Sequence, residues 1–197
     1  MTKITTDFNF KGMKKLIEEI TKDYQIRVGL LSGAGGADEV SEDLDLAGLG
    51  AIMEYGATIH VTDKMRKYLA SQGLHLKAST TEIHIPARSF LQMPLEQKMD
   101  EILKKTRNDY SIQELNYFLE NNQLTLINFA VALGANCIEA IQEAFETQGF
   151  GEWAPNHPYT IDNKGSSSPL IDTGALRQKI TAEIVSPDGT LYVGGNK

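Results

Sequence analysis

The residues with the clearest chemical potential lie near the C-terminal end of the chain, where Asp172, Thr173 and Gly174 follow one another. Asp-Thr-Gly is typical of the active-site loop of aspartic proteases, in which two carboxylates share a proton and activate water. A single-chain enzyme of this kind needs two such loops, because two close carboxylates push each other's pKa values apart, and this chain has one. A protease built from two copies, each supplying Asp172, stays an alternative.

The residues around Asp172 favour a structural role. Only 25 residues follow it, whereas the retroviral type of protease builds most of its strands, its flap and its substrate cleft after this loop. Residues 175–180 suit a helical turn, and Asp or Thr at the start of a helix commonly accepts a backbone N–H. We therefore predict that Asp172 or Thr173 is a helix cap, with Leu176 and Ile180 turned toward the core.

A second pattern is close to a calcium loop. Asp43, Asp45, Gly48 and Glu54 occupy the first, third, sixth and twelfth places of an EF-hand, whose spacing closes an oxygen cage around Ca²⁺. Ala47 stands at the fifth place, where an oxygen ligand is required. We predict no calcium site, and interpret Asp43 and Asp45 as acids near a helix N-terminus, where negative charge is favourable.

The remaining candidate groups also lack the spacing of a site. The histidines do not pair at zinc-binding intervals; they are His60, His75, His84 and His157. Cys137, the lone cysteine, falls on the apolar stripe of an expected helix and is interpreted as a small buried hydrophobe. The chain has no phosphate-binding glycine loop and no nucleophile elbow. We predict no enzyme activity, no cofactor and no metal.

Composition sets the class of protein. A chain of 197 residues with 41% apolar and 23% charged residues has the balance of one soluble globular domain, 1–197. The net charge of −7 argues against a surface that grips phosphates, so we predict no specific nucleic-acid binding. No stretch has the roughly 18 apolar residues of a membrane span, and residues 1–12 lack the apolar core of a signal peptide. We expect no membrane association, and synthesis in the cytosol.

Periodicity predicts the elements. Apolar residues at helical spacing indicate helices at 10–20, 46–53, 65–71, 95–106, 111–119 and 127–145, and Gly56 and Gly149 are expected to end two of them. Alternation indicates strands at 24–31, 83–85, 180–184 and 191–193, the last two as a hairpin. The fold class is therefore α+β: a small, mostly antiparallel sheet with packed helices, a helical middle section and a C-terminal β-hairpin.

Four segments stand out in the order of elements. Residues 32–45 hold five acids and no base, which indicates a solvated loop. Residues 57–82 are interpreted as an insertion or arm, 89–148 as a helical section, and 150–168 as a long loop.

The long loop carries the candidate interface residues, Phe150, Trp153, Pro155 and Tyr159. Rigid aromatic side chains are favoured at the centres of protein interfaces. The alternative, which the sequence leaves open, is that Trp153 packs on its own domain, as the side chains of long loops commonly do.

Several stretches resemble, in their order, a family of phage proteins. They are Val28-Gly29-Leu30, residues 51–56 (Ala-Ile-Met-Glu-Tyr-Gly), residues 85–91 (Ile-Pro-Ala-Arg-Ser-Phe-Leu), the segment 149–164, and residues 169–177 (Pro-Leu-Ile-Asp-Thr-Gly-Ala-Leu-Arg). The set resembles the virion morphogenesis proteins of tailed bacteriophages, which include neck and tail completion proteins. Ser89 departs from the family pattern, which more commonly has proline there, and this puts only the local turn in doubt.

The resemblance implies a non-catalytic α+β subunit of the head-to-tail junction that assembles into a ring or layer. Its expected partners are copies of itself and other phage connector or tail proteins. Its expected location is the virion, at the neck or tail junction, after synthesis in the cytoplasm of the host bacterium. Two alternatives stay open: the dimeric protease that uses Asp172, and a nonstructural adaptor that binds one partner through the long loop.

Overall fold

The structure is a computed structural model, which describes residues 25–31, 38–41, 44–109, 126–186 and 189–195. Its strands are β1 (Gln25–Gly29), β2 (Glu39–Ser41), β3 (Leu44–Asp45), β4 (Ala57–His60), β5 (Glu82–Ile85), β6 (Thr181–Ser186) and β7 (Gly189–Gly195). Its helices are α2 (Leu46–Tyr55), α3 (Asp63–Ser71), α4 (Gln92–Asp109), α6 (Leu126–Glu146), α7 (Pro158–Lys164) and α8 (Ala175–Gln178). The predicted α+β class is confirmed.

The main sheet joins the two ends of the described chain. Its three antiparallel strands lie in the order β1-β6-β7, with Ile26 opposite Ile184 and Val28 opposite Ala182. Strands β6 and β7 form the predicted C-terminal hairpin, in which Ser186 pairs with Gly189. Apolar pairs on one face of adjacent strands give this sheet a side that must be covered.

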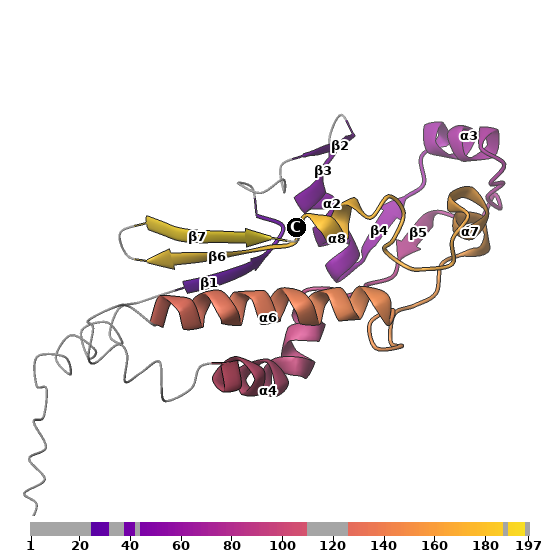
Figure 1. Cartoon of the computed structure of the whole chain (residues 1–197). Coiled ribbons are helices and arrows are strands. Elements are labelled where there is room, and N and C mark those ends of the chain that lie inside the picture. The colour runs from indigo at the N-terminus through magenta and orange to yellow at the C-terminus, as the bar shows by residue number, and fades with distance from the viewer. Residues whose placement is uncertain (1–24, 32–37, 42–43, 110–125, 187–188, 196–197) are drawn as a thin grey trace, which may run out of the picture.

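Helix α6 covers that side and α4 lies beyond it, so the body has the layers sheet, α6 and α4 (Figure 1). The predicted stripe of α6 is the core, since Ile141 and Phe145 are 0% and 1% exposed. Gly134 permits the close approach, because a Cβ there would lie 3.0 Å from the Ala182 Cβ. The periodicity that predicted this helix therefore also identified its packing face.

A smaller cluster joins α4 to α6. Cys137 is buried against Ile102, as predicted, and burial raises the pKa of its thiol. Beside it the Asn136 side-chain amide donates to the Thr106 hydroxyl at 2.9 Å, and that hydroxyl donates to the Ile102 carbonyl at 2.8 Å. The buried polar groups of this layer thus have partners, which is the condition for burying them without a penalty.

A left-handed turn ends α6 and returns the chain to the core. Residues 148–151 all have positive φ, at 55°, 65°, 54° and 84° in chain order. The turn brings the Trp153 ring edge-on to Phe145, with the ring centroids 5.6 Å apart. Gly149 ends the helix as predicted, and a Cβ on it would lie 2.3 Å from Trp153 Cδ1.

Two segments predicted as loops contain regular structure. Within 32–45, β2 pairs with β3, with Glu39 opposite Asp45; strands of three and two residues are too short to show alternation. Within 150–168, α7 begins at Pro158, is capped by the His157 side chain and ends at Gly165 with φ 66°. Pro at the first helical position and Gly after the last are helix boundary signals. The predicted helices at 10–20 and 111–119 lie outside the described residues.

The segment predicted as an arm, 57–82, has a defined structure that extends to residue 85. Strands β4 and β5 form a two-stranded antiparallel ladder with Ile59 opposite Ile83, and α3 lies between them in the chain. Strand β4 was not predicted, because four residues at an edge give too little alternation to separate from a loop. We call residues 57–85 the arm; it extends away from the main sheet (Figure 1).

The close contact at Gly149 predicts unequal costs for two similar glycine substitutions. Gly149→Ala and Gly151→Ala both place a side chain at positive φ, but nothing lies within 4 Å of a Cβ at Gly151. We expect each to lose about 1 kcal/mol from backbone strain, and Gly149→Ala to lose roughly 1 to 3 kcal/mol more from overlap with Trp153. Urea denaturation of both variants measures the difference; equal losses would contradict the packing of Trp153.

Candidate binding groove and the Glu54 junction

Asp172 does not cap a helix. The residue at the N-cap of α8 is Gly174, with φ 80° and no side-chain cap bond, so the prediction for Asp172 is wrong. Thr173 is not at the cap position either; it lies one residue before it, and its hydroxyl accepts the Ala175 N–H at 3.3 Å. The chain bends at residues 172–174, and Gly174, in the left-handed region, leads into the helix. The Asp172 side chain is exposed and lies near Lys164.

The calcium-like residues serve separate structural roles. Asp45 is the N-cap of α2, where its carboxylate accepts the Gly48 N–H at 2.7 Å. Glu54 lies near the end of α2, and its side chain is buried and binds residues 89–92 instead of pointing toward Asp45. Asp43 lies outside the described residues. Within the described ranges, no three His, Cys, Asp or Glu side chains form a group that could hold a metal ion.

Two of the histidines, His60 and His84, meet at one carboxylate, and His157 lies elsewhere. On the exposed face of the arm, His60 and His84 lie 3.2 Å and 3.9 Å from the Glu82 carboxylate, and His84 Nδ1 is 2.9 Å from the Thr58 hydroxyl. His157 caps α7 by accepting the Tyr159 N–H at 3.2 Å.

A buried carboxylate joins α2 to α4. The Glu54 side chain is 5% exposed and accepts four hydrogen bonds from residues 89–92. The donors are Ser89 Oγ at 2.6 Å, Phe90 N at 2.7 Å, Leu91 N at 2.9 Å and Gln92 N at 3.0 Å. These backbone N–H groups lie at the N-terminus of α4, where a helix leaves donors without partners and favours negative charge. We call this arrangement the Glu54 junction.

Arg88 and Trp153 fasten the 153–156 segment to the same junction. Arg88 donates from Nε to the Ala154 carbonyl at 2.8 Å and from Nη2 to the Pro155 carbonyl at 3.1 Å, and its backbone N–H donates to Met53 O at 2.7 Å. The Trp153 indole N–H donates to Ser89 O at 3.0 Å. The Arg88 side chain is 7% exposed, and this burial lowers its pKa.

The predicted interface residues separate into buried and accessible ones. Trp153 is 7% exposed and belongs to the core, so its interpretation as an interface residue is wrong and its packing on its own domain is the correct alternative. Phe150 is half-buried beneath Lys98, whose Nζ lies 5.3 Å from the ring centroid. Tyr159 is half-buried and donates from its hydroxyl to Gln72 O at 3.2 Å, which ties α7 to the arm. Pro155 is exposed.

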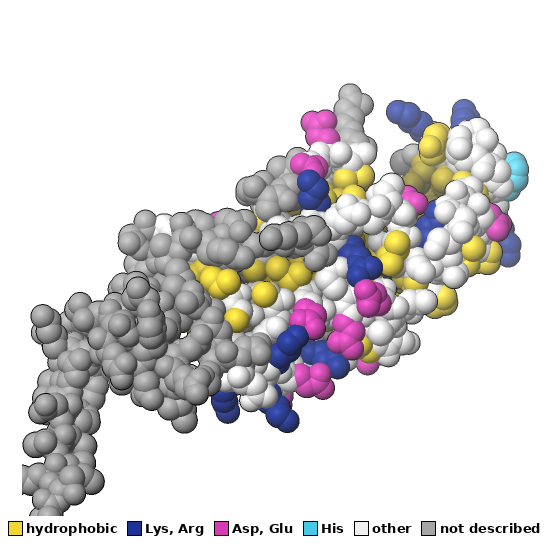
Figure 2. Space-filling view, in the orientation of Figure 1, with side chains coloured by type: hydrophobic (Ala, Val, Ile, Leu, Met, Phe, Trp, Pro, Cys, Tyr) yellow, Lys and Arg dark blue, Asp and Glu magenta, His cyan; other side chains and the backbone are white. Residues whose placement is uncertain are grey.

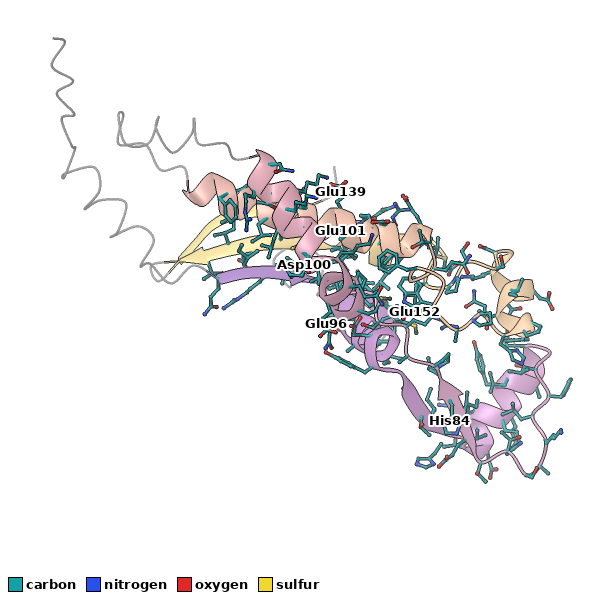
Figure 3. All side chains as sticks on the ribbon, turned by 90° about the horizontal axis from the view of Figure 1, so that it is seen from below. His84, Glu96, Asp100, Glu101, Glu139 and Glu152 are labelled. Carbon is teal, nitrogen blue, oxygen red and sulfur yellow. The ribbon has the colours of Figure 1, made fainter. Side chains whose placement is uncertain are left out.

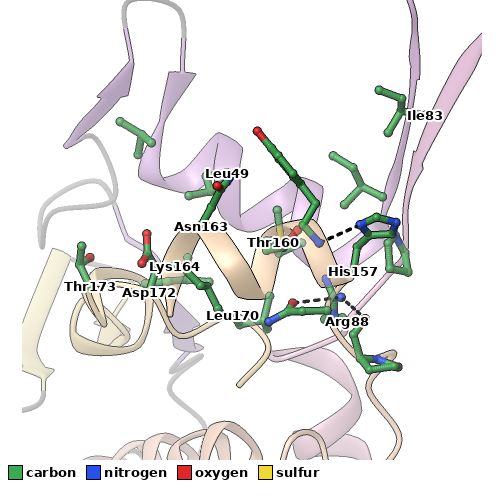
Figure 4. A pocket seen from close by; sticks show the side chains of 18 of the residues that line it. Leu49, Ile83, Arg88, His157, Thr160, Asn163, Lys164, Leu170, Asp172 and Thr173 are labelled. Carbon is green, nitrogen blue, oxygen red and sulfur yellow. Dashed lines mark hydrogen bonds between the residues drawn. The ribbon is translucent and has the colours of Figure 1, made fainter. Parts of the chain in front are cut away.

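A groove of about 1200 Å³ opens between the arm and the body. Figure 4 shows the lining residues coming from different elements: Leu49 from α2, Ile83 from β5, and Thr160, Asn163 and Lys164 from α7. Further apolar side chains line it; they are Met53, Leu74, Leu76, Ile85 and Leu170. The groove has the mixture of apolar walls and few polar groups that binding sites favour.

The two positively charged side chains that line the groove, Arg88 and Lys164, donate hydrogen bonds to uncharged backbone carbonyls. Lys164 donates to Ser168 O and to Ile171 O. Burial lowers the pKa of Lys164, the charge of Asp172 partly opposes this, and the charge of Arg88 adds to the lowering. Aspartic-protease chemistry uses two carboxylates, so the second would have to come from Asp172 of another copy.

Sequence reasoning missed the residues that organise this region. From the sequence, Glu54 enters only as the last place of the calcium-like pattern and within the stretch 51–56, and Arg88 only within the stretch 85–91. Hydrophobic periodicity does not mark a buried charge. The partners of Glu54 become visible only when the fold brings residues 89–92 beside it.

Removal of the Glu54 charge is expected to weaken the fold. Glu54→Gln replaces one accepting oxygen with an NH₂ group that faces N–H donors, and we expect a loss of roughly 2 to 4 kcal/mol in the free energy of unfolding. Chemical denaturation measures it, with Glu152→Gln as the control, because among the described residues that exposed carboxylate accepts only from the Gln97 side chain. A Glu54→Gln variant as stable as the control would contradict the role of the junction.

Comparison with known proteins adds no relative. No protein-family model matches the chain, and no curated protein and no solved structure matches it significantly. No helix in the described ranges is both long and apolar enough to cross a membrane. What the chain does must therefore be inferred from its own contacts.

Proposed function

We propose that this chain is a structural, non-catalytic subunit of the head-to-tail junction of a tailed bacteriophage, in the neck or in tail completion. In this role it works as an oligomer, in contact with copies of itself and with other connector or tail proteins. Its place is the virion, after synthesis in the host cytoplasm, and it uses neither a cofactor nor specific binding to nucleic acid.

One observation carries the proposal: the stretches that resemble the phage family meet in space. Glu54, from 51–56, binds residues 89–91 of the stretch 85–91. Arg88 binds carbonyls of the segment 149–164, and Lys164 of that segment binds Ile171 O in 169–177. Stretches that are far apart in the chain thus form one structural unit, which supports a common origin of their order.

The groove supports a role in assembly. Its walls come from the arm and the body, and its apolar side chains are partly open to solvent. Apolar surface of this kind commonly marks a contact with another molecule. The groove therefore offers the oligomer or a connector partner a place to bind.

The decisive experiment is the imaging of particles assembled without this protein. If the protein joins heads to tails, its absence leaves filled heads and separate tails, and its return during assembly restores joined particles. Mass spectrometry of purified wild-type particles should also find several copies per particle. Normal infectious particles in its absence would overturn the proposal, as would its absence from wild-type particles, which is the result expected of a nonstructural adaptor.

The protease alternative has its own test in Asp172→Asn. Because the Asp172 side chain is exposed, we expect this variant to change the free energy of unfolding by less than about 0.5 kcal/mol. We also expect neither wild type nor variant to cleave peptides at low pH. Cleavage by the wild type that pepstatin blocks, and that the variant lacks, would favour the protease.

A further inference from the structure

The arm lacks the packing that its elements need. None of the nine residues of α3 is buried, and Tyr68 on this helix is 63% exposed. Helices of this length are marginal in water and draw most of their stability from packing. A two-stranded ladder such as β4–β5 is marginal for the same reason. The exposed surface of the arm is therefore available to pack against another molecule.

The arm is nevertheless held in a defined shape. Arg66 of α3 donates to Lys77 O at 2.8 Å and to Thr80 O at 2.7 Å, and Val61 N donates to Thr81 O at 2.8 Å. These bonds fix α3 against the loop that leads to β5. A partner that binds α3 does not have to order it first, which lowers the entropic cost of binding.

The outer face of α3 is basic. The arm carries four basic residues against Asp63 and Glu82, in a chain that has 19 basic and 26 acidic residues in all. Arg66 is used inside the arm, whereas Lys64 and Lys67 are exposed and form no ion pair with any described residue. Lys64, Lys67 and Tyr68 follow the spacing i, i+3, i+4 and share one face. Figure 2 shows Lys and Arg side chains at the arm end of the molecule.

Helix α4 presents the complementary face. Glu96, Met99 and Asp100 have the same spacing and are exposed, Met99 by 38%. Glu96 accepts from the Gln92 side chain at 2.7 Å, and neither acid forms an ion pair among the described residues. Lys104, one turn later, ends the acidic face. In Figure 3 Glu96 and Asp100 lie near the middle of the view, close to the labels of Glu101 and Glu152 and apart from His84 of the arm.

We propose that the basic face of α3 docks on the acidic face of α4 in a second copy of this chain. Lys64 and Lys67 meet Glu96 and Asp100, and the Tyr68 ring lies on Met99, a favourable sulfur–aromatic contact. The contact joins different surfaces of the two copies, so it repeats head to tail and forms a ring when the rotation closes. This contact rests on the proposed function, and it specifies which surfaces of two copies meet in the oligomer.

Charge reversal with complementation tests this contact. The full-length wild type is expected to self-associate at low ionic strength, and its mass is measured against concentration by sedimentation. Lys64→Glu with Lys67→Glu, and Glu96→Lys with Asp100→Lys, should each weaken association about tenfold or more, because attraction becomes repulsion. A mixture of the two double variants should restore it, since every contact between unlike copies is again attractive. Lys77→Glu, elsewhere on the arm, is the control and should associate like wild type.

Three outcomes would overturn the contact: a wild type that keeps the 21.7 kDa monomer mass at every concentration, double variants that associate like wild type, or a mixture that does not recover. Disulfide trapping gives a second readout. A Tyr68→Cys chain mixed with a Met99→Cys chain should form a mixed dimer, whereas Tyr55→Cys, at a tyrosine 73% exposed on α2, should not.

The outcomes separate this contact from the proposed function. A monomeric protein whose absence still leaves heads and tails apart would overturn the α3–α4 contact and keep the assembly role. A protein that oligomerises through these faces, while particles form normally without it, would keep the contact and overturn the role.

Discussion

The arrangement of this protein depends on one buried carboxylate. Glu54 lies at the last turn of α2, and its two oxygens receive the Ser89 hydroxyl and three backbone N–H groups from residues 90–92. Burial of a charge is unfavourable unless hydrogen bonds replace its water, and four short bonds do so here. The N-terminus of α4 supplies an electrostatic attraction as well. The direction of α4 relative to α2 is therefore fixed by electrostatics and not by apolar packing alone.

The path of the chain near this carboxylate leaves little freedom. Gly56 follows α2 with φ 73°, and a Cβ there would lie 2.8 Å from both Ile85 O and Ala87 N, so α2 and the end of β5 touch backbone to backbone. Arg88 then binds two carbonyls of the 154–155 segment. Because both ends of the arm are fixed within a few residues of Glu54, the junction also sets the position of the arm and the width of the groove.

The sequence predicted the elements that a local pattern of residues specifies, and it did not predict the contacts between residues far apart in the chain. Helix α6 and the β6–β7 hairpin repeat a local pattern over many residues, so periodicity finds them. The boundary signals of α7 were present in Pro158 and Gly165. The helix itself has only seven residues, which are too few to show an apolar pattern. Glu54 and Arg88 could not be assigned locally, because their partners lie 35 to 68 residues away in the chain. The groove depends on both, and so it was not predicted.

The aromatic residues show how composition can mislead about interfaces. Trp153 has the residue type that interface centres favour, yet its ring packs on Phe145 and its N–H binds Ser89. A domain whose main sheet has three strands needs large side chains to fill its core. Trp153 is one of the side chains that fill it. The surface left for contacts then consists of less distinctive residues, such as Lys67 and Tyr68 on a helix with no buried residue. For this reason the contact that we propose is placed on the element that lacks packing, and not on the residue type that interfaces favour.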